Sequence, residues 1–330
     1  MSKDPIIYAG FADGLEELNH AAVSSLMVKT PAGRAYKKNS GIYLDSVHTS
    51  SIDVWNDQHL LLEKKFERNF ASHGGKVYMG AAGFLNLGYI AAAKPAAAIL
   101  FDVNVAQTVF WKDVIQALAD HADVKGFIDF LEQERIDLPS KLKKTFNRFS
   151  VETSGSLSDG FNSLETITQK TIYRRFDNGI LDWLNEKSVA RKADRRWIKY
   201  GYDHLHIMAK NGAIGAITLD VTDKKACQQL KSHLEKVRYR TMSVDKETPK
   251  KQGRGALVDI MYVSNIFDFL QESGCTDWSG RPLVDATPEK ARKNLETFIN
   301  PKGAKIIDDC PDPKNLTWPE ISFPWPKNIF

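Results

Sequence analysis

The sequence contains little cysteine and no long hydrophobic run. Its three cysteines, Cys227, Cys275 and Cys310, are widely spaced and form no C-x-x-C pair. Neither a disulfide framework nor a cysteine zinc cluster is therefore predicted. No stretch approaches the roughly 18 apolar residues of a membrane span, and the start, MSKDPIIYAG, has no basic-then-apolar signal pattern. We expect a cytoplasmic protein without a membrane span.

Motifs of covalent catalysis are also missing. The chain contains no G-x-S-x-G elbow and no Ser-His-Asp order, and Cys227 falls on the apolar stripe of an expected helix. His204 and His206 form an H-x-H pair, which on a strand would place both imidazoles on one side, as metal ligands can lie. No third ligand has a telling spacing, so we expect no metal and a local role near a site.

Composition and charge are ordinary. With 42% hydrophobic and 26% charged residues, the 330-residue chain can form a full globular core. A net charge of +4 is only mildly basic and argues little about partners. It leaves nucleic acid open as a partner, although we favour a small-molecule acceptor.

The stretch KVYMGAAGFLNLGYIAAAKPAAAILFD, which ends at Asp102, indicates a nucleotide-cofactor domain. A short apolar strand leads through a turn with Gly80 and Gly83 into a helix, which must end near Pro95 because proline lacks the backbone donor. A second strand, over 96–101, is apolar on consecutive positions, as in a strand buried on both faces of a parallel sheet. Asp102 follows Gly80 at roughly the 20-residue spacing of a ribose-binding acid.

Further strands and helices alternate after this unit. AIGAITLD predicts a strand ending on Asp220, and ALVDIMYVSN predicts another whose end carries Ser264 and Asn265. Thr287 is the expected N-cap of a later helix, with Pro288 at its first position. NPKGAKIIDD predicts the next strand and TWPEISFPWPKNIF an irregular or edge segment. Apolar periodicity predicts two further amphipathic helices, one marked by Trp111, Val114, Ile115 and Leu118 and the other by Cys227, Leu230, Leu234 and Val237.

The expected organisation is a doubly wound, mostly parallel α/β sheet with a helical insertion. Residues 1–55 form an N-terminal extension, with a short helix around 14–26, the basic connection TPAGRAYKKNSG and a strand at 42–45. Residues 56–120 and 205–330 form the α/β domain, which opens with the helix DQHLLLEKKFERNF and includes the lysine-rich loop DKETPKKQGRG.

Residues 121–204 form a mainly helical insertion and a candidate lid, with helices expected at 125–135, 139–148 and 179–190. It is locally basic, with acids interleaved. The basic residues form either a solvated helix face or a surface for an acidic substrate. These residues are Arg174, Arg175, Arg191, Lys192, Arg195 and Arg196.

Together these pieces resemble the class I S-adenosylmethionine-dependent methyltransferase fold, which is Rossmann-like. The turn Gly80–Gly83 corresponds to the glycine turn after the first strand of that fold, and Asp102 to the acid that ends the second. A narrower resemblance is to a family of uncharacterised bacterial proteins of this architecture. It is carried by GGKVYMGAAGFLNLGYIAAAKPAAAILFDVN, SGIYLDSVHTSS and YVSNIFDFL.

The resemblance implies S-adenosylmethionine as cofactor, S-adenosylhomocysteine as product and methyl transfer to an unknown acceptor. It implies cofactor contacts from Gly80, Ala82, Gly83, Asp102, Asp220, Ser264 and Asn265. Physical alternatives stay open for these residues: a ligand-free tight turn for the glycines, helix N-caps for Asp102 and Asp220, and a simple chain turn for Asn265. Asp220 and His204 are the candidate bases, and Asp259 is expected to be structural.

Two departures from the family pattern keep other functions in view. Tyr78 stands where methyltransferases often have an acid, and Ala82 stands where a second glycine is expected. Both favour a methyltransferase-like protein that binds without turnover. The SNIFDFL stretch instead resembles enzymes that transfer the aminocarboxypropyl group of the same cofactor. The chain is thus an uncertain enzyme, with a transferase as the first hypothesis.

Overall fold

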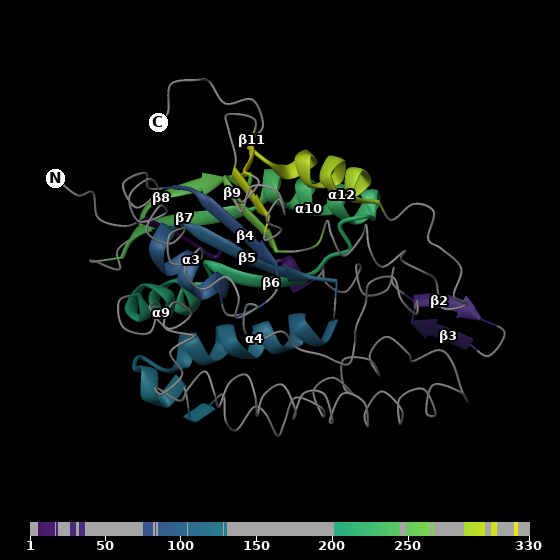
Figure 1. The fold of residues 1–330 in the computed structure, drawn as a ribbon. Helices are drawn as coiled ribbons and strands as arrows, with labels where there is room; N and C mark the ends of the chain where they lie inside the picture. Colours follow the sequence, from purple (N-terminus) through teal and green to yellow (C-terminus); the bar gives the residue numbers. More distant parts are fainter. Residues whose placement is uncertain are drawn as a thin grey trace.

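The structure is a computed structural model (Figure 1). It describes residues 6–16, 18, 27–30, 33–36, 75–81, 83, 85–103, 105–127, 129–130, 201–244, 249–264, 266, 287–300, 305–308 and 320–322. The expected strand at 42–45, the helix DQHLLLEKKFERNF, most of the insertion, Ala82 and Asn265 lie outside these residues.

A six-stranded sheet, in the order β11-β10-β9-β4-β5-β6, is the centre of the described fold. Every neighbouring pair is parallel except β10 and β11, which are antiparallel. Read from β6, the strands follow the 3-2-1-4-5 order of doubly wound nucleotide-binding sheets. The strands are β4 (Val77–Ala81), β5 (Ala97–Asp102), β6 (Ile214–Thr218), β9 (Ile260–Ser264), β10 (Lys305–Asp308) and β11 (Glu320–Ser322).

Consecutive burial confirms the predicted parallel strands. All residues of β4 and β6 are buried, as are those of β5 up to its last, Asp102. β6 ends at Thr218, so the expectation that this strand ends on Asp220 is wrong by two residues. The tail contributes β11, an antiparallel edge strand, as its composition predicted.

Helices cover both faces of the sheet (Figure 1). Side chains alternate along each strand, so Tyr78 and Leu100 face one apolar core while Met79 and Ile99 face the other. One core is completed by α3 (Leu85–Ala93), α4 (Val105–Asp120) and α9 (Tyr202–Lys210); the other is completed by α10 (Lys224–Lys236), α12 (Pro288–Leu295) and the 3-10 turn η4 (Glu296–Phe298). This mixed α/β architecture is compatible with a Rossmann-like fold.

The helix termini follow local sequence signals. α3 stops before Lys94, which has a positive φ of 45°, and Pro95. The Thr287 hydroxyl accepts a hydrogen bond from the Lys290 amide at 3.2 Å, and Pro288 begins α12, as predicted. α10 begins after Asp223, whose carboxylate is its N-cap. Asp220 is therefore not the cap of α10.

Antiparallel strands correct two expected loops. The basic connection TPAGRAYKKNSG contributes to a hairpin of β2 (Met27–Thr30) and β3 (Gly33–Tyr36). The lysine-rich loop DKETPKKQGRG contains β8 (Pro249–Arg254), which pairs with β7 (Arg238–Ser243); β1 (Ile6–Ala9) lies on the other side of β7. Strand pairing satisfies the backbone of these polar segments, so their composition alone misled the prediction.

The H-x-H pair is also corrected. His204 and His206 lie in the helix α9, not on a strand. Residues two positions apart in a helix do not point to the same side. Among the residues that the structure describes, no helix is both long and apolar enough to cross a membrane.

Candidate functional site

The candidate site is the carboxyl edge of the parallel sheet, where β4 lies between β5 and β9. From β4 the chain order runs outward through β5 and β6 on one side, and through β9 and β10 on the other. This reversal is the topological switch point at which open α/β sheets bind ligands. The pairing of Gly80 with Leu100 and of Ala81 with Phe101 places the glycine turn beside the end of β5.

Gly80 is required by the chain's own side chains. A Cβ at this position would lie 1.8 Å from Asn86 Oδ1 and 2.7 Å from the Tyr78 hydroxyl oxygen. Both distances are far below van der Waals contact, so alanine cannot fit while these side chains stay in place. The glycine therefore makes room for Tyr78, which the sequence placed beside the turn, and for Asn86, which it did not.

The Asn86 side chain holds the glycine turn through hydrogen bonds on its buried side. The side chain is fully buried at the start of α3, and its Nδ2 donates to the carbonyls of Ala81, at 2.7 Å, and Gly83, at 2.8 Å. Its Oδ1 accepts a hydrogen bond of 2.7 Å from the buried Tyr78 hydroxyl. The Gly83 carbonyl also accepts from the Asn86 amide at 3.1 Å, and each hydrogen bond of the Asn86 side chain contributes about 1 kcal/mol.

Asp102 is the last residue of β5 and is half-buried at the carboxyl edge. Its position pairs with Thr218 of β6, and its carbonyl accepts a 2.9 Å hydrogen bond from the Leu219 amide. The backbone of this acid is thus fixed by the neighbouring strand, within one strand spacing of the glycine turn. A carboxylate held there can accept hydrogen bonds from a vicinal diol.

Asp220 shapes the loop after β6. Its Oδ1 accepts hydrogen bonds from the amide of Thr222, at 2.9 Å, and from the Thr222 hydroxyl, at 2.6 Å. The next carbonyl along the chain, that of Val221, accepts from Asn294 Nδ2 of α12 at 3.0 Å. The loop is therefore held from two directions, and Asp220 has a structural role at the same edge as Asp102.

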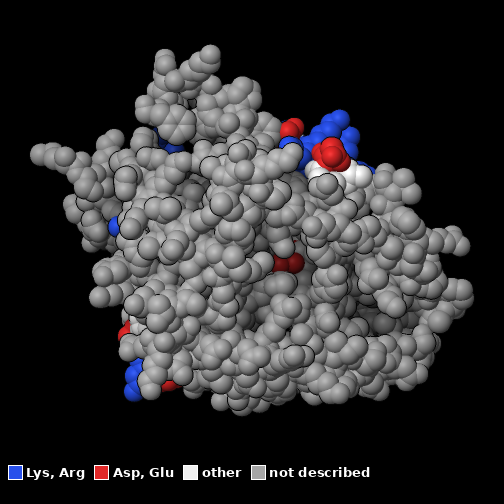
Figure 2. Space-filling view, viewed as in Figure 1, with Lys and Arg blue, Asp and Glu red and all other residues white. Residues whose placement is uncertain are grey.

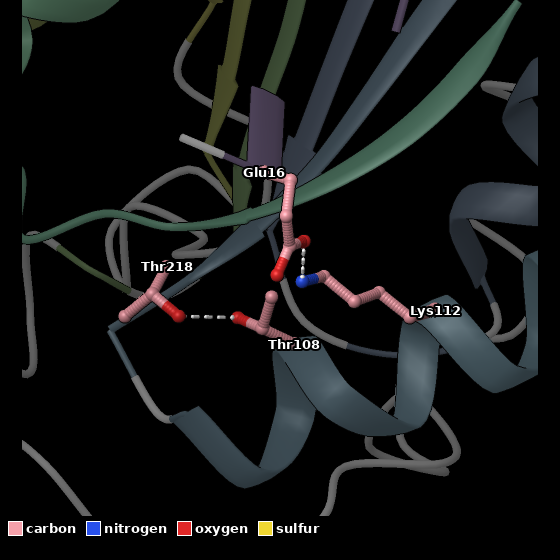
Figure 3. A network of polar contacts seen from close by, with 4 residues as sticks. All are labelled: Glu16, Thr108, Lys112 and Thr218. Atoms are coloured by element: carbon pink, nitrogen blue, oxygen red, sulfur yellow. Dashed lines mark hydrogen bonds and ion pairs between the residues drawn. The ribbon is translucent and has the colours of Figure 1, made fainter. Parts of the chain in front are cut away.

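Buried polar residues connect α4 to β6 below this edge. Figure 3 shows the Thr218 hydroxyl donating to the Thr108 hydroxyl, at 3.0 Å, and Lys112 forming an ion pair with Glu16 of the N-terminal segment. Thr108 and its neighbour Gln107 are almost fully buried. Two polar residues in the first turns of an otherwise apolar helix were the sequence signal for this layer, but the prediction did not use it.

His204 lies at the opposite, amino edge of the sheet. Its imidazole is hydrogen-bonded to the backbone of Pro95, which precedes β5, whereas Asp102 ends that strand. At about 3.3 Å per residue the two ends are roughly 20 Å apart. Burial and the nearby Lys94 ammonium lower the pKa of His204 to about 4. The structure therefore does not bring His204 together with Asp220.

The remaining candidates are only partly described. Gly83 is buried in the turn, and Ser264 ends β9 at the carboxyl edge, but its side chain is outside the described atoms. Cys227 is fully buried, and burial raises the pKa of its thiol, so the sulfur stays protonated at neutral pH. Within the described ranges no three His, Cys, Asp or Glu side chains cluster as metal ligands.

Asp259 joins the amino ends of β4 and β9. Its carboxylate accepts 2.8 Å hydrogen bonds from the Val77 amide and from Asn300 Nδ2, while its own amide donates to the Val77 carbonyl at 2.9 Å. These bonds agree with the structural role expected for Asp259.

A protein family covers most of this architecture. The model of the "Domain of unknown function (DUF7790)" family matches residues 56–274, which is more than half of the chain. The chain belongs to the DUF7790 family. The DUF7790 match includes Gly80, Asp102 and Asp220, whereas β10, β11 and α12 lie beyond it. No curated protein matches the chain.

Proposed function

We propose that this protein is an S-adenosylmethionine-dependent methyltransferase that acts on a small-molecule acceptor. The observation that carries the proposal is the switch point, where the glycine turn after β4 and Asp102 after β5 lie on adjacent paired strands. A nucleoside bound across these two strand ends would have its ribose beside a carboxylate. The family resemblance of the turn and of Asp102 supports S-adenosylmethionine as that nucleoside.

The residues of the edge fit the nucleoside part of this cofactor. Asp102 offers a charged acceptor for two ribose hydroxyls, and Asp220 lies beyond the next strand, where the adenine would lie. The space next to Gly80 is filled by Asn86 and Tyr78, so the amino-acid portion would contact the outer side of the turn. The bound cofactor supplies a methyl group already activated by its sulfonium.

The chain needs to supply little acid–base chemistry for this reaction. Alignment of two bound reactants can itself contribute about 7–11 kcal/mol. His204 lies on the amino side of the sheet, which leaves Asp220 as the base candidate for an acceptor that must lose a proton. Its two hydrogen bonds from Thr222 hold one oxygen in place.

Isothermal titration of S-adenosylhomocysteine into wild-type protein and the Asp102→Asn variant tests the proposal. Asparagine keeps the shape but loses the charge-assisted bonds, so the variant should bind at least 10-fold more weakly, about 1.4 kcal/mol. Asp120→Asn is the matched control, because Asp120 ends α4 at the other edge and, among the described residues, accepts only from Gln116. Equal affinity of all three proteins would refute the ribose role of Asp102.

A binding protein without turnover is the second candidate, and the closed turn favours it. Asn86 and Tyr78 occupy the position where a glycine turn would otherwise leave room for a ligand. The product released from S-adenosylmethionine separates the candidates. Methyl transfer leaves S-adenosylhomocysteine, aminocarboxypropyl transfer leaves methylthioadenosine, and a binding protein leaves the cofactor unchanged.

A further inference from the structure

An arginine-rich face lies at the open end of the β7–β8 hairpin, away from the connecting loop. β7 (RYRTMS) and β8 (PKKQGR) together contain five basic residues and no acidic residue. Arg238 pairs with Arg254, and Arg240 pairs with Gln252. Directly paired residues share one face of an antiparallel sheet, so these four side chains, here called the arginine face, point the same way. All four are exposed.

The arginine face has no counter-charge in the described part of the protein. Arg238, Arg240 and Arg254 form no ion pair there, and the nearby Glu235 lies 3.7 Å from Lys231. Like charges placed directly opposite, as in the Arg238–Arg254 pair, destabilise a sheet. An anion bound between the two guanidinium groups would offset this repulsion.

The spacing of the arginine face suits a line of phosphates. Paired side chains start about 5 Å apart across the strands, and Arg238 and Arg240 lie about 7 Å apart along β7. Three guanidinium forks within this area can contact successive phosphates of one backbone, with bidentate bonds to each. A single small anion would use only part of the face.

The chemistry of the face argues against a protein or membrane partner. The aromatic residue of β7, Tyr239, is turned to the opposite face, where its ring stacks on Tyr8 with centroids 3.9 Å apart. Among the described residues of β7 and β8, the arginine face therefore offers no aromatic anchor for a protein interface and no exposed apolar side chain to enter a bilayer. A highly cationic surface without apolar anchors is typical of nucleic-acid interfaces.

The arginine face is separate from the candidate cofactor edge. β1 joins β7 to the amino edge of the large sheet, since the Tyr8 amide donates to the Ala96 carbonyl at 2.7 Å. In Figure 1, β7 and β8 accordingly lie at the end where β5 begins. The surface over α10 and α12 differs from the face, because basic and acidic residues lie side by side there (Figure 2).

We propose that the arginine face binds the sugar–phosphate backbone of a nucleic acid. Contacts to phosphate carry no sequence information, so binding is sequence-independent and depends strongly on salt. Three phosphate contacts predict a slope of about −2.7 for log K against log salt, or roughly a 40-fold loss of affinity from about 50 to 200 mM salt.

Fluorescence anisotropy with a labelled mixed-sequence DNA duplex, measured over this salt range on the full chain, tests the proposal. The triple variant Arg238→Gln, Arg240→Gln, Arg254→Gln should lose most of the affinity and nearly all of the salt slope. Its matched control is Lys224→Gln, Lys225→Gln, Lys236→Gln, which removes equal charge from exposed positions of α10. The control should retain the wild-type slope.

Thermal unfolding shows whether the triple variant is folded, and we expect its midpoint to equal or exceed that of wild type, because the repulsion is removed. If the triple variant does not fold, the single variants Arg238→Gln and Arg254→Gln should each reduce the slope by about 1. Wild-type binding by the variants, or equal losses in the α10 control, would overturn the proposal. Competition by polyglutamate as strong as that by unlabelled duplex, or binding only to phosphatidylserine vesicles, would also overturn it.

Discussion

Asn86 satisfies three polar groups within the turn that begins the candidate site. It donates to two carbonyls and accepts from the Tyr78 hydroxyl, all inside the protein. Gly80 is compatible with this arrangement only because it has no Cβ. At the residue scale, the glycine and the asparagine therefore form one structural unit, whether or not a ligand binds outside the turn.

The Asn86→Ala variant should lower the free energy of unfolding by about 2–4 kcal/mol, because three hydrogen bonds of a fully buried side chain are lost. Urea denaturation measures this change. Asn211→Ala is the control, since Asn211 is half-buried and its Nδ2 makes one bond, to the Ile207 carbonyl at 2.9 Å. It should cost about 1 kcal/mol.

The Gly80→Ala change should be less harmful in the Asn86→Ala background, because the closest contact of the new Cβ, 1.8 Å from Asn86 Oδ1, is then removed. Strict additivity of the two substitutions would contradict the steric account of Gly80.

His204 makes the stability of the protein depend on pH. Its pKa is lowered from 6.5 to about 4, so the unfolded chain binds more protons between these values. The contribution of His204 to the free energy of unfolding is complete above pH 6.5. It falls as the pH decreases toward 4, by about 3 kcal/mol in total. Urea denaturation from pH 4 to 7 should show a shallower dependence for His204→Gln than for His121→Gln. The same dependence in both variants would be evidence against this role.

At the element scale, short polar side chains determine where the helices begin. The Asp223 carboxylate accepts from the amides of Lys225, at 2.8 Å, and Ala226, at 3.2 Å, at the start of α10. Thr287 has the same role for α12. α10 then leads the chain back to the amino edge, where β7 begins.

Asp223→Ala should reduce the free energy of unfolding by about 1 kcal/mol, because two amides of the first turn lose their acceptor. Chemical denaturation tests this against Glu235→Ala in the same helix. That control removes the same charge from an exposed pair with Lys231 and should cost less than about 0.5 kcal/mol. A cost for Asp223→Ala no larger than for the control would show that the cap does not stabilise α10.

The parallel strands and the helices between them could be predicted from the sequence because burial on both faces demands continuous apolar runs, as in β5. β7 and β8 could not be predicted from composition, because their exposed basic side chains give no apolar strand pattern. In addition, the strand β1 that pairs with β7 is distant in the sequence. His204 was misplaced because H-x-H was interpreted with strand periodicity.

The candidate site shows the same division. Asp102 was found at the carboxyl edge because its position follows from the end of an apolar run. Asn86 was missed because its partners, the Tyr78 hydroxyl and two carbonyls, converge only in three dimensions. The strand order that brings β9 beside β4 also depends on pairing across a long sequence separation.

At the scale of the whole molecule, the two proposed functions lie on different sheets, one at the carboxyl edge of the six-stranded sheet and the other on the three-stranded sheet β1-β7-β8. The carboxyl edge has the glycine turn and Asp102, while the amino edge is joined through β1 to the arginine face. Nucleoside binding and nucleic-acid binding should therefore be separable. The Asp102→Asn variant should keep duplex binding, and the triple arginine variant should keep S-adenosylhomocysteine binding.

Thermal unfolding with millimolar S-adenosylmethionine, S-adenosylhomocysteine or NAD tests the central claim most directly. Ligand at 100 times its dissociation constant adds about 2.7 kcal/mol to the stability of the folded protein. We predict that both sulfur nucleosides raise the midpoint by several degrees, that NAD does not, and that the rise is about half as large or smaller in Asp102→Asn. An unchanged midpoint with both sulfur nucleosides would contradict it.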